Sequence, residues 1–284
     1  MYSDNTGIPV LYIDTPENNP IVNKVNWVDG ANVSLKMPDG SISVLGKTSI
    51  KGRGNSTWTM PQKPYALKFE EKVPILGMPA NKRWVLLANW LDRTLLRNAT
   101  AFEISRQTSL MWTPKGEFVD VMLNGVNIGN YYLCEQIRID KSRVNINKMS
   151  YQDIEGESIT GGYLLELDLN YDEVNKFKSE YRELPYMIKQ PDEKDINNEQ
   201  FLYIKSYINN LEASLFDKDR FKKKEYLNYL DIESLIDWWF VHELSENYEP
   251  KWPKSSYFYK DKSGKLTAGP VWDFDHETFP TWND

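Results

Sequence analysis

The stretch that decides the fold is a pair of apolar runs near the middle of the chain, Phe118–Gly125 (FVDVMLNG) and Asn130–Ile137 (NYYLCEQI). Both runs are rich in residues that favour strands, and Asn124-Gly125 lies between them. Asn-Gly tolerates the positive φ angles that a tight hairpin turn requires. We therefore expect an antiparallel β-hairpin at this point.

The segments before this hairpin also have strand patterns. Residues 8–14 and 33–50 are apolar runs, the second broken by the turn residues Met37–Gly40 (MPDG). Ser49–Trp58 is expected to run from a strand into a loop with two glycines, and Lys63–Phe69 to return as the next strand. The N-terminal part of the chain is therefore predicted to be rich in strands.

Helical periodicity begins near Asp92, which we predict to be the N-cap of a helix that ends near Leu110. Apolar residues within 201–215 follow a 3.6-residue period, and Asp231 is expected to cap a further helix that Pro250 stops. Strands are predicted between and after these helices, at Gly161–Asp168, Tyr186–Lys189, Ser255–Lys260 and Lys265–Asp275. We expect an α+β protein, strand-rich in its N-terminal part and helix-rich in its C-terminal part.

The last predicted strand ends in Gly269–Asp275 (GPVWDFD), which carries two carboxylates one residue apart. Side chains alternate along a strand, so Asp273 and Asp275 would point one way and Phe274 the other. Oxygen ligands of this kind suit a hard cation such as Mg²⁺ or Mn²⁺. The alternative is an ordinary turn or helix cap, in which aspartate is also common.

The loop after the strand at residue 49 contains small, polar and basic residues: Gly52, Arg53, Gly54, Asn55 and Ser56. Because glycine lets backbone N–H groups approach an anion closely, this loop is a candidate phosphate cradle. A plain β-turn is the alternative, since a single Gly-x-Gly is weak evidence.

Three charged residues that follow this loop along the chain have roles that the sequence leaves open. Lys68 faces away from Tyr65 on the returning strand. An inward lysine there would pair with a charge, and an outward one would be a surface residue. Arg97 and Glu103 lie on the predicted helix. Either could form an ion pair with a lysine or a phosphate, or could be a solvated surface residue.

The overall composition excludes several classes of protein. The 284 residues suit one large domain or two packed lobes, and 40% hydrophobic with 26% charged residues is typical of a globular protein. The formal net charge of −7 argues against nucleic-acid binding, because contacts to phosphates need clustered Lys and Arg. The dense basic cluster, Lys222–Lys224, is expected on a solvated face.

The single cysteine, Cys134, excludes an intrachain disulfide framework. The two histidines, His242 and His276, leave little for a zinc site or a Ser-His-Asp triad. The chain has no apolar run of 18 residues and no signal-peptide pattern, so we expect a soluble protein without a transmembrane segment. A cell-surface or extracytoplasmic location stays open, because a leader can be removed, and the oligomeric state is not defined.

A series of motifs runs along the chain: Lys51–Trp58 (KGRGNSTW), Lys63–Phe69 (KPYALKF), Leu96–Asn98 (LRN), Leu123–Gly125 (LNG) with Tyr132–Gln136 (YLCEQ), Gly161–Glu166 (GGYLLE) and Gly269–Asp275 (GPVWDFD). In this order they resemble the spore coat protein CotH family over most of the chain. Members of that family resemble protein kinases in fold and are regarded as atypical kinases that bind ATP and phosphorylate proteins. The resemblance implies a two-lobed, protein-kinase-like fold for a single domain over residues 1–284, with lobes at 1–137 and 138–284.

The resemblance also implies a nucleotide site. The hairpin at Gly52–Ser56 would cover the phosphates of ATP, Lys68 would pair with them, and Glu103 would be the partner of that lysine. Tyr132–Gln136, which contains Glu135, would lie beside the adenine. Lys63, at the start of its motif, is counted with the nucleotide-binding residues.

The catalytic part of the family pattern falls on the C-terminal residues. Asp273, with Asp275 beside it, would hold Mg²⁺ or Mn²⁺, and Glu249 would be the catalytic acid alongside Lys68. The chain departs from the pattern twice, because many members have Asp at the position of Glu249, and an Asn is often found at the position of Ser255. Serine is a weaker metal ligand than the carbonyl of asparagine, so turnover depends on these two substitutions more than nucleotide binding does.

We therefore predict an ATP-dependent protein kinase that transfers the γ-phosphate to Ser or Thr of a protein substrate. The alternative is a catalytically weak or inactive kinase-like surface or assembly module, which would bind a protein or glycan partner through exposed aromatic residues such as Trp238, Trp252 or Trp282. A third interpretation is a metal-assisted phosphoesterase, which would need further acids, such as Glu166 and Asp168, beside Asp273.

Overall fold

A computed structural model describes residues 7–276 and 278–280 of the chain. The described residues fall into two compact units. Unit 1 lies within Met1–Leu95 and Pro114–Gln136, and unit 2 lies within Leu96–Thr113 and Ile137–Asp284. The helix nearest the middle of the chain, α1 (Arg97–Arg106), therefore belongs to unit 2.

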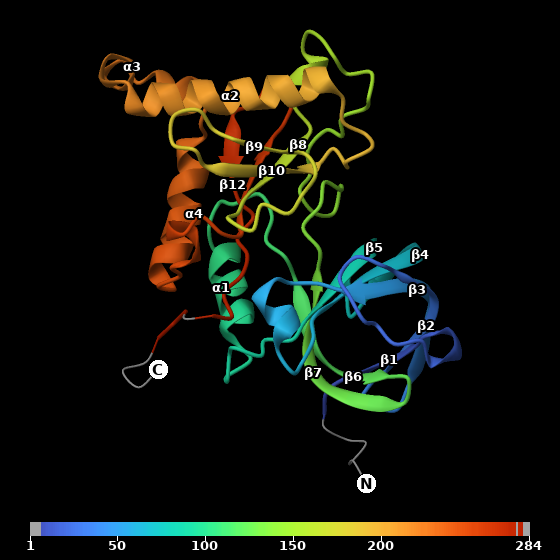
Figure 1. The fold of residues 1–284 in the computed structure, drawn as a ribbon. Coiled ribbons are helices and arrows are strands. Elements are labelled where there is room, and N and C mark those ends of the chain that lie inside the picture. The colour runs from blue at the N-terminus through green and yellow to red at the C-terminus, as the bar shows by residue number, and fades with distance from the viewer. Residues whose placement is uncertain (1–6, 277, 281–284) are drawn as a thin grey trace. The chain divides into compact units, whose positions relative to one another are not determined.

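Unit 1 is a closed β-barrel, drawn from blue to green in Figure 1. Its strands are β1 (Val10–Asp14), β2 (Val28–Lys36), β3 (Ile42–Gly52), β4 (Tyr65–Ile75), β5 (Met78–Leu87), β6 (Gly116–Leu123) and β7 (Val126–Glu135). They follow the order β1-β2-β3-β4-β5-β7-β6 around the barrel. Neighbours pair antiparallel except β1 and β6, whose parallel pairing closes the barrel.

The predicted hairpin is confirmed as β6 and β7. Leu123 pairs with Val126 across a two-residue turn in which Asn124 has φ of 50° and Gly125 has φ of 74°. These positive angles at both central positions match the twist of the flanking strands, which is why Asn-Gly is favoured there.

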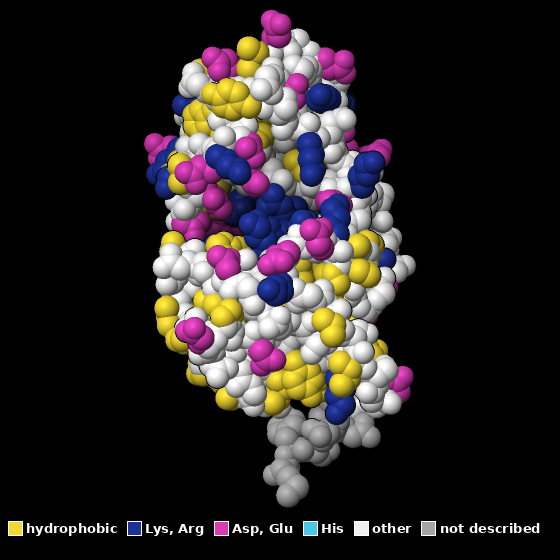
Figure 2. Space-filling view, turned by 90° about the vertical axis from the view of Figure 1, so that its right-hand side faces the viewer, with side chains coloured by type: hydrophobic (Ala, Val, Ile, Leu, Met, Phe, Trp, Pro, Cys, Tyr) yellow, Lys and Arg dark blue, Asp and Glu magenta, His cyan; other side chains and the backbone are white. Residues whose placement is uncertain are grey.

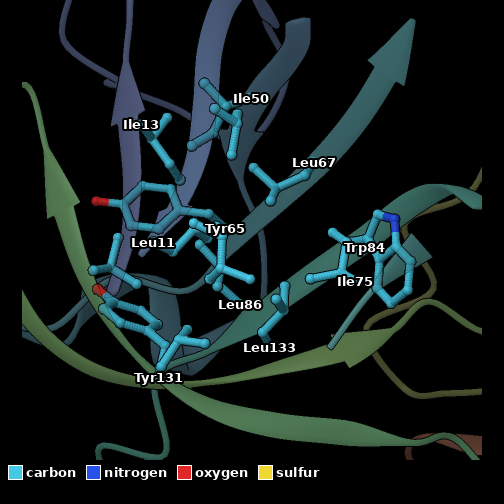
Figure 3. Close-up of a cluster of buried hydrophobic side chains, with 14 of the residues drawn as sticks. Leu11, Ile13, Ile50, Tyr65, Leu67, Ile75, Trp84, Leu86, Tyr131 and Leu133 are labelled. Carbon is cyan, nitrogen blue, oxygen red and sulfur yellow. The ribbon is translucent and has the colours of Figure 1, made fainter. Parts of the chain in front are cut away.

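The barrel is filled by one face of each strand. Phe69 of β4 belongs to this core. Leu67 and Tyr65 of the same strand lie among side chains from the other strands, as Figure 3 shows. Trp84 of β5 is fully buried, and its indole N–H donates to the carbonyl of Asn81 at 3.0 Å. The alternation of buried and exposed residues thus follows the two-residue period expected of a half-buried strand.

Unit 2 is built on a five-stranded antiparallel sheet in the order β12-β11-β8-β10-β9. The strands are β8 (Tyr163–Leu167), β9 (Lys176–Lys178), β10 (Pro185–Gln190), β11 (Ser256–Lys260) and β12 (Leu266–Ala268). The helices of this unit besides α1 are α2 (Asn198–Phe216), α3 (Lys218–Lys222) and α4 (Ile232–Leu244). The apolar stripe of α2 packs on one face of the sheet, where its residues Ile204, Ile208 and Leu211 join Tyr163 and Leu165.

Helix starts in unit 2 follow local capping chemistry. Asn197 and Gln200 form a reciprocal capping box at α2, with the Gln200 N–H donating to Asn197 Oδ1 at 2.9 Å. Asp231 caps α4 as predicted, accepting from the Ser234 N–H. Asp92 is not a helix cap, because α1 begins only at Arg97 and the Asp92 carboxylate accepts from Thr94 within a turn.

The prediction of a two-lobed, protein-kinase-like α+β fold with a helix-rich C-terminal part is wrong. The N-terminal strands close into a seven-stranded barrel, and the described residues contain only four α-helices, two of them with ten residues or fewer. Helical periodicity is visible within single segments of the C-terminal part, whereas its short strands come from five separate segments and pair only through the sheet. The described residues are strand-rich, and most of the strand residues belong to the barrel of unit 1.

None of the helices in the described part of the chain combines the length and the apolar character needed to cross a membrane. Figure 2 shows one face of the molecule, where Lys and Arg side chains gather with Asp and Glu side chains beside them. That face carries mixed charge, in keeping with a sequence that has 34 basic and 41 acidic residues.

Candidate functional site in unit 2

The acidic segment Gly269–Asp275 is a loop and not the end of a strand. Strand β12 stops at Ala268, and Asp273 has φ of 68°, in the left-handed region. Aspartate tolerates this conformation better than most residues because its short side chain can hydrogen-bond locally. The expectation that strand alternation points Asp273 and Asp275 the same way is therefore wrong, and other residues must fix their positions.

Ser255 holds the Asp273 side chain from one side. The Ser255 hydroxyl donates to Asp273 Oδ2 at 2.9 Å, and the Ser255 N–H donates to Asp168 Oδ2 at 3.0 Å. Asp168, directly after β8, is buried, and its other carboxylate oxygen accepts from the Asn170 N–H at 2.7 Å. Ser255 thus links an acid that follows β8 to the acid that follows β12.

Asn247 holds the same loop through its backbone. Its amide group donates to the carbonyl of Asp273 at 3.0 Å, and its Oδ1 accepts from the N–H of Glu249 at 3.0 Å. Both side-chain groups of this buried asparagine are used, one on each segment. The predicted catalytic acid and the predicted metal ligand are therefore tied to one side chain.

The environment of Glu249 favours its protonated form more than water would. Partial burial raises the pKa of Glu249, and the nearby negative charge of Asp273 raises it further. Lys254, whose Nζ lies 3.6 Å from Glu249 Oε1, acts in the opposite direction. A carboxyl with a raised pKa beside a second carboxylate is typical of general acid–base sites.

A buried layer supports the loop from behind. The Phe274 N–H donates to Oδ1 of Asn98, on α1, at 2.9 Å, and both residues are buried. The Phe274 ring stacks on His242 of α4, with the ring centroids 4.9 Å apart, and meets Phe102 edge-on. Sequence reasoning missed Asn98 and His242 as supports of the acidic loop, although Leu96–Asn98 was among the family-like motifs.

His242 should make the stability of unit 2 fall in mild acid. Burial lowers the pKa of His242 to about 3, and neither ring nitrogen has a hydrogen-bond partner among the residues that the structure describes. The unfolded chain takes up a proton on this side chain near pH 6.5 and the folded chain does not, so stability is full above pH 6.5 and falls as the pH is lowered toward 3.

The measurement is urea unfolding at pH 7 and pH 5. We expect His242→Phe, which keeps the ring stack on Phe274, to lose less stability between these two pH values than the wild type does. An unchanged pH dependence in His242→Phe would show that this side chain does not remain neutral in the fold.

The side chains of Asp273, Asp275 and Ser255 carry oxygen atoms, which are the ligands that a hard divalent cation prefers. Asp273 and Asp275 offer carboxylates and Ser255 a hydroxyl, and Mg²⁺ commonly binds through one or two carboxylates together with substrate phosphates. A complete protein cage is not expected, and within residues 7–276 and 278–280 no group of three or more His, Cys, Asp or Glu could hold a metal ion. Asp275 is buried, two residues beyond Asp273.

Of the two distant acids that a phosphoesterase would need, only Asp168 joins this network. Glu166, on β8, lies with one carboxylate oxygen 3.0 Å from Lys189 Nζ, and Lys189 also pairs with Glu173. Burial raises the pKa of Glu166, while the Lys189 charge opposes that shift. Glu166 therefore belongs to an ion-pair cluster on the sheet.

The glycine loop predicted to cover phosphates lies in unit 1, between β3 and β4. The Gly52 N–H donates to the carbonyl of Asn23 at 3.0 Å, and the Arg53 N–H donates to the carbonyl of Pro64 at 3.1 Å. Asn55 Oδ1 accepts from Lys24 Nζ at 3.2 Å, and Ser56 begins a short 3-10 turn that ends at Thr59. Two of the backbone N–H groups expected for an anion are thus used inside the protein.

Gly52 is required for packing against Trp58. A Cβ atom on Gly52 would lie 2.3 Å from the Trp58 ring, so the ring would have to move. We expect Gly52→Ala to lower the free energy of unfolding by about 1–3 kcal/mol, the usual cost of overpacking. In a Trp58→Leu background the same substitution should cost much less. An equal cost in both backgrounds, measured by urea unfolding, would contradict this explanation.

The two lysines predicted to bind nucleotide differ in their surroundings. Lys63 Nζ donates to the carbonyl of Trp58 at 2.8 Å and lies over the Trp58 ring, so it holds the glycine loop. Lys68 is exposed on β4, on the opposite face from Leu67 and Phe69, and so points out of the barrel. The Lys68 side chain therefore has the outward orientation, one of the two that the sequence allowed, and its role in binding phosphate stays a prediction.

The two glutamates predicted to act at the nucleotide site, Glu103 and Glu135, each accept hydrogen bonds from nearby groups of the protein. Glu103 accepts hydrogen bonds from Arg106 and Gln107 of its own helix, and the Arg106 bond lowers the pKa of Glu103. Glu135 ends β7 and is buried, and its Oε2 accepts from the Lys115 N–H at 3.0 Å. Their proposed contacts with Lys68 and with the nucleotide stay predictions.

In unit 2, hydrogen bonds from Ser255 connect the carboxylates of Asp168 and Asp273, which lie on segments that follow strands of the antiparallel sheet. The family model described as CotH kinase protein matches residues 50–284. This match covers most of the chain and includes the acidic loop, so the protein belongs to the CotH kinase protein family. No curated protein gives a significant match to the chain.

Proposed function

We propose that this chain is an ATP-dependent protein kinase that uses Mg²⁺ and transfers the γ-phosphate to a Ser or Thr hydroxyl of a protein. The family match supports kinase chemistry. One hydrogen-bonding arrangement supports the position of the catalytic site in the chain. That arrangement is the pair of Asn247 hydrogen bonds, which ties Glu249 to the backbone of Asp273. It brings a carboxyl of raised pKa close enough to Asp273 for the two charges to interact.

In this proposal each residue of the loop network has a defined task. Asp273 and Asp275, with Ser255, would hold Mg²⁺, which would supply positive charge to the phosphates of ATP. Glu249 in its ionised form accepts the proton of the substrate hydroxyl as that oxygen bonds to the γ-phosphorus and the bond to ADP breaks. Lys254 stabilises the ionised form of Glu249, and Asn98 and His242 keep the loop in position.

The nucleotide-binding residues are proposed from the family resemblance. They are Gly52, Arg53, Gly54, Asn55, Ser56, Lys63 and Glu135, with Lys68 on the phosphates and Glu103 as a charge partner. Because Lys63 fixes the Trp58 carbonyl, its substitution is expected to disturb the loop as well as any contact with ATP. Lys68 is the cleaner test, since no structural role is apparent for an exposed side chain on β4.

The test is incorporation of γ-labelled phosphate from ATP into a generic protein substrate in the presence of Mg²⁺. We expect incorporation by the wild type and by Asp195→Ala, which removes an exposed aspartate of the same unit. Asp273→Ala should reduce the label to background. Label transfer that survives in Asp273→Ala would remove this residue from the site.

The second candidate function is that of a non-catalytic surface or assembly module, which binds a partner without transferring phosphate. Its support is that the Ser255 hydroxyl donates to Asp273 and that Lys254 pairs with Glu249. Trp252 is exposed, Trp238 is buried, and Trp282 lies outside the described residues. If this function is correct, Glu249→Gln binds a partner as the wild type does and neither protein turns over ATP.

A further inference from the structure

Helix α4 carries large apolar side chains on its outer face as well as on its inner face. The inner residues, among them Trp238, Val241 and His242, are buried, and the helix packs against β12 and α1. The outer residues Ile236, Trp239, Phe240 and Leu244 are between 48% and 56% exposed. In Figure 1, α4 forms one edge of unit 2, with β12 and α1 on one side of it.

We call these four outer residues the docking face. Their spacing of three, one and four positions keeps them on one side of a helix. A surface helix ordinarily carries polar residues on its solvent side, and contiguous exposed apolar side chains of this size mark interaction sites. Two further aromatic side chains, Tyr248 and Trp252, are exposed in the segment that follows.

The segment of chain that carries the docking face is acidic, and the first basic residue after it is Lys251, whose Nζ lies 4.2 Å from the centre of the Tyr248 ring. Residues 231–250 contain no Lys or Arg and six acids: Asp231, Glu233, Asp237, Glu243, Glu246 and Glu249. Glu233, Glu243 and Glu246 are exposed, and the carboxylate of Asp237 accepts from the N–H and hydroxyl of Ser109. An apolar strip with an acidic border is complementary to an apolar strip with a basic border.

We propose that the docking face of α4 binds an amphipathic helical segment of a partner protein, whose apolar side chains are flanked by Lys and Arg. Helices bind such surfaces through side chains at positions i, i+3, i+4 and i+7. A second copy of this chain would bring two acidic borders together, and an anionic bilayer would repel them. The proposal does not depend on whether the chain turns over ATP.

The experiment is selection from a displayed library of random 20-residue peptides against the intact chain. Counter-selection uses the double variant Trp239→Ser, Phe240→Ser, whose substituted side chains are exposed, so that it should keep its fold. We expect enriched peptides to have apolar residues at helical spacing with Lys or Arg beside them. The double variant should bind them at least about tenfold more weakly, the usual loss when a central aromatic contact is removed.

Two matched variants separate the apolar from the electrostatic contribution. Leu202→Ser removes an exposed leucine from α2 and should bind the enriched peptides as the wild type does. Glu233→Lys with Glu243→Lys should weaken binding of the same peptides and reduce the dependence of that binding on salt. Circular dichroism on each variant checks that the fold is retained.

Four outcomes would overturn the proposal. One is a selection that enriches no peptide over the double variant, and another is enrichment of acidic or uncharged sequences. A third is concentration-dependent dimerisation of the wild type that Trp239→Ser with Phe240→Ser abolishes, which would assign the face to a second copy. The last is binding to vesicles of anionic lipid that depends on the same two aromatic residues.

Discussion

Replacing Glu249 by glutamine should lower the rate of phosphoryl transfer by roughly 10²–10⁴-fold, the usual contribution of a positioned general base. Glutamine keeps nearly the shape of the side chain but cannot accept the proton of the substrate hydroxyl. The Glu249 N–H bond to Asn247 does not involve the side chain, so the loop geometry should persist. ATP affinity in Mg²⁺ should therefore change little.

The rate should also depend on pH in a defined direction. Burial and the charge of Asp273 raise the pKa of Glu249, and only the ionised carboxyl can accept a proton. The wild-type rate should therefore fall as the pH is lowered through this raised pKa, and the residual rate of Glu249→Gln should not show that step. Glu249→Asp should retain more activity than Glu249→Gln, while Glu199→Gln, at an exposed position of α2, should match the wild type. A Glu249→Gln variant with full activity would contradict the assignment.

Replacing Asn98 by leucine should release the acidic loop. The Phe274 N–H is buried and donates to Asn98 Oδ1, and leaving such a group without its acceptor costs about 1–3 kcal/mol. Part of that cost should appear as lower affinity for ATP in Mg²⁺. If the free energy of ATP binding becomes less favourable by about 1.4 kcal/mol, the affinity falls about tenfold. The measurements are urea unfolding and ATP titration on the same variant.

Asn98→Asp is the control for that experiment, because a carboxylate oxygen can still accept from Phe274. We expect it to recover much of the affinity for ATP that Asn98→Leu loses. If both variants bind Mg²⁺ and ATP as the wild type does, the Asn98 contact is not needed to position Asp273 and Asp275.

Local features of the fold were predictable where neighbouring residues determine them. Asn124-Gly125 determined the β6–β7 hairpin, and Asp231 determined the start of α4. The barrel was not predictable in the same way, because its closure depends on the parallel pairing of β1 with β6, more than a hundred residues apart. The kinase-like fold was expected from the family resemblance, and single segments do not reveal that the five short strands of unit 2 share one sheet.

The candidate site shows the same division. The sequence pattern predicted a role for Asp273 and the family resemblance added Glu249 and Ser255; these roles stay predictions, while the structure gives Ser255 a definite partner in Asp273. The sequence did not predict the left-handed turn at Asp273. It also did not predict the contacts of Asn98 and His242 with Phe274, because these two residues lie on helices far away in the sequence. The role of Glu103 as a partner of Lys68 stays a prediction, and in the structure its carboxylate pairs with Arg106, one turn away on its own helix.

The central claim is that the loop around Asp273 binds the metal complex of ATP. Calorimetric titration with ATP, with and without Mg²⁺, on the wild type, Asp273→Ala and the control Asp195→Ala tests it most directly. The wild type and Asp195→Ala should bind ATP more tightly in Mg²⁺ than without it, and Asp273→Ala should lose that difference. Binding by Asp273→Ala that equals the wild type in Mg²⁺ would contradict the claim.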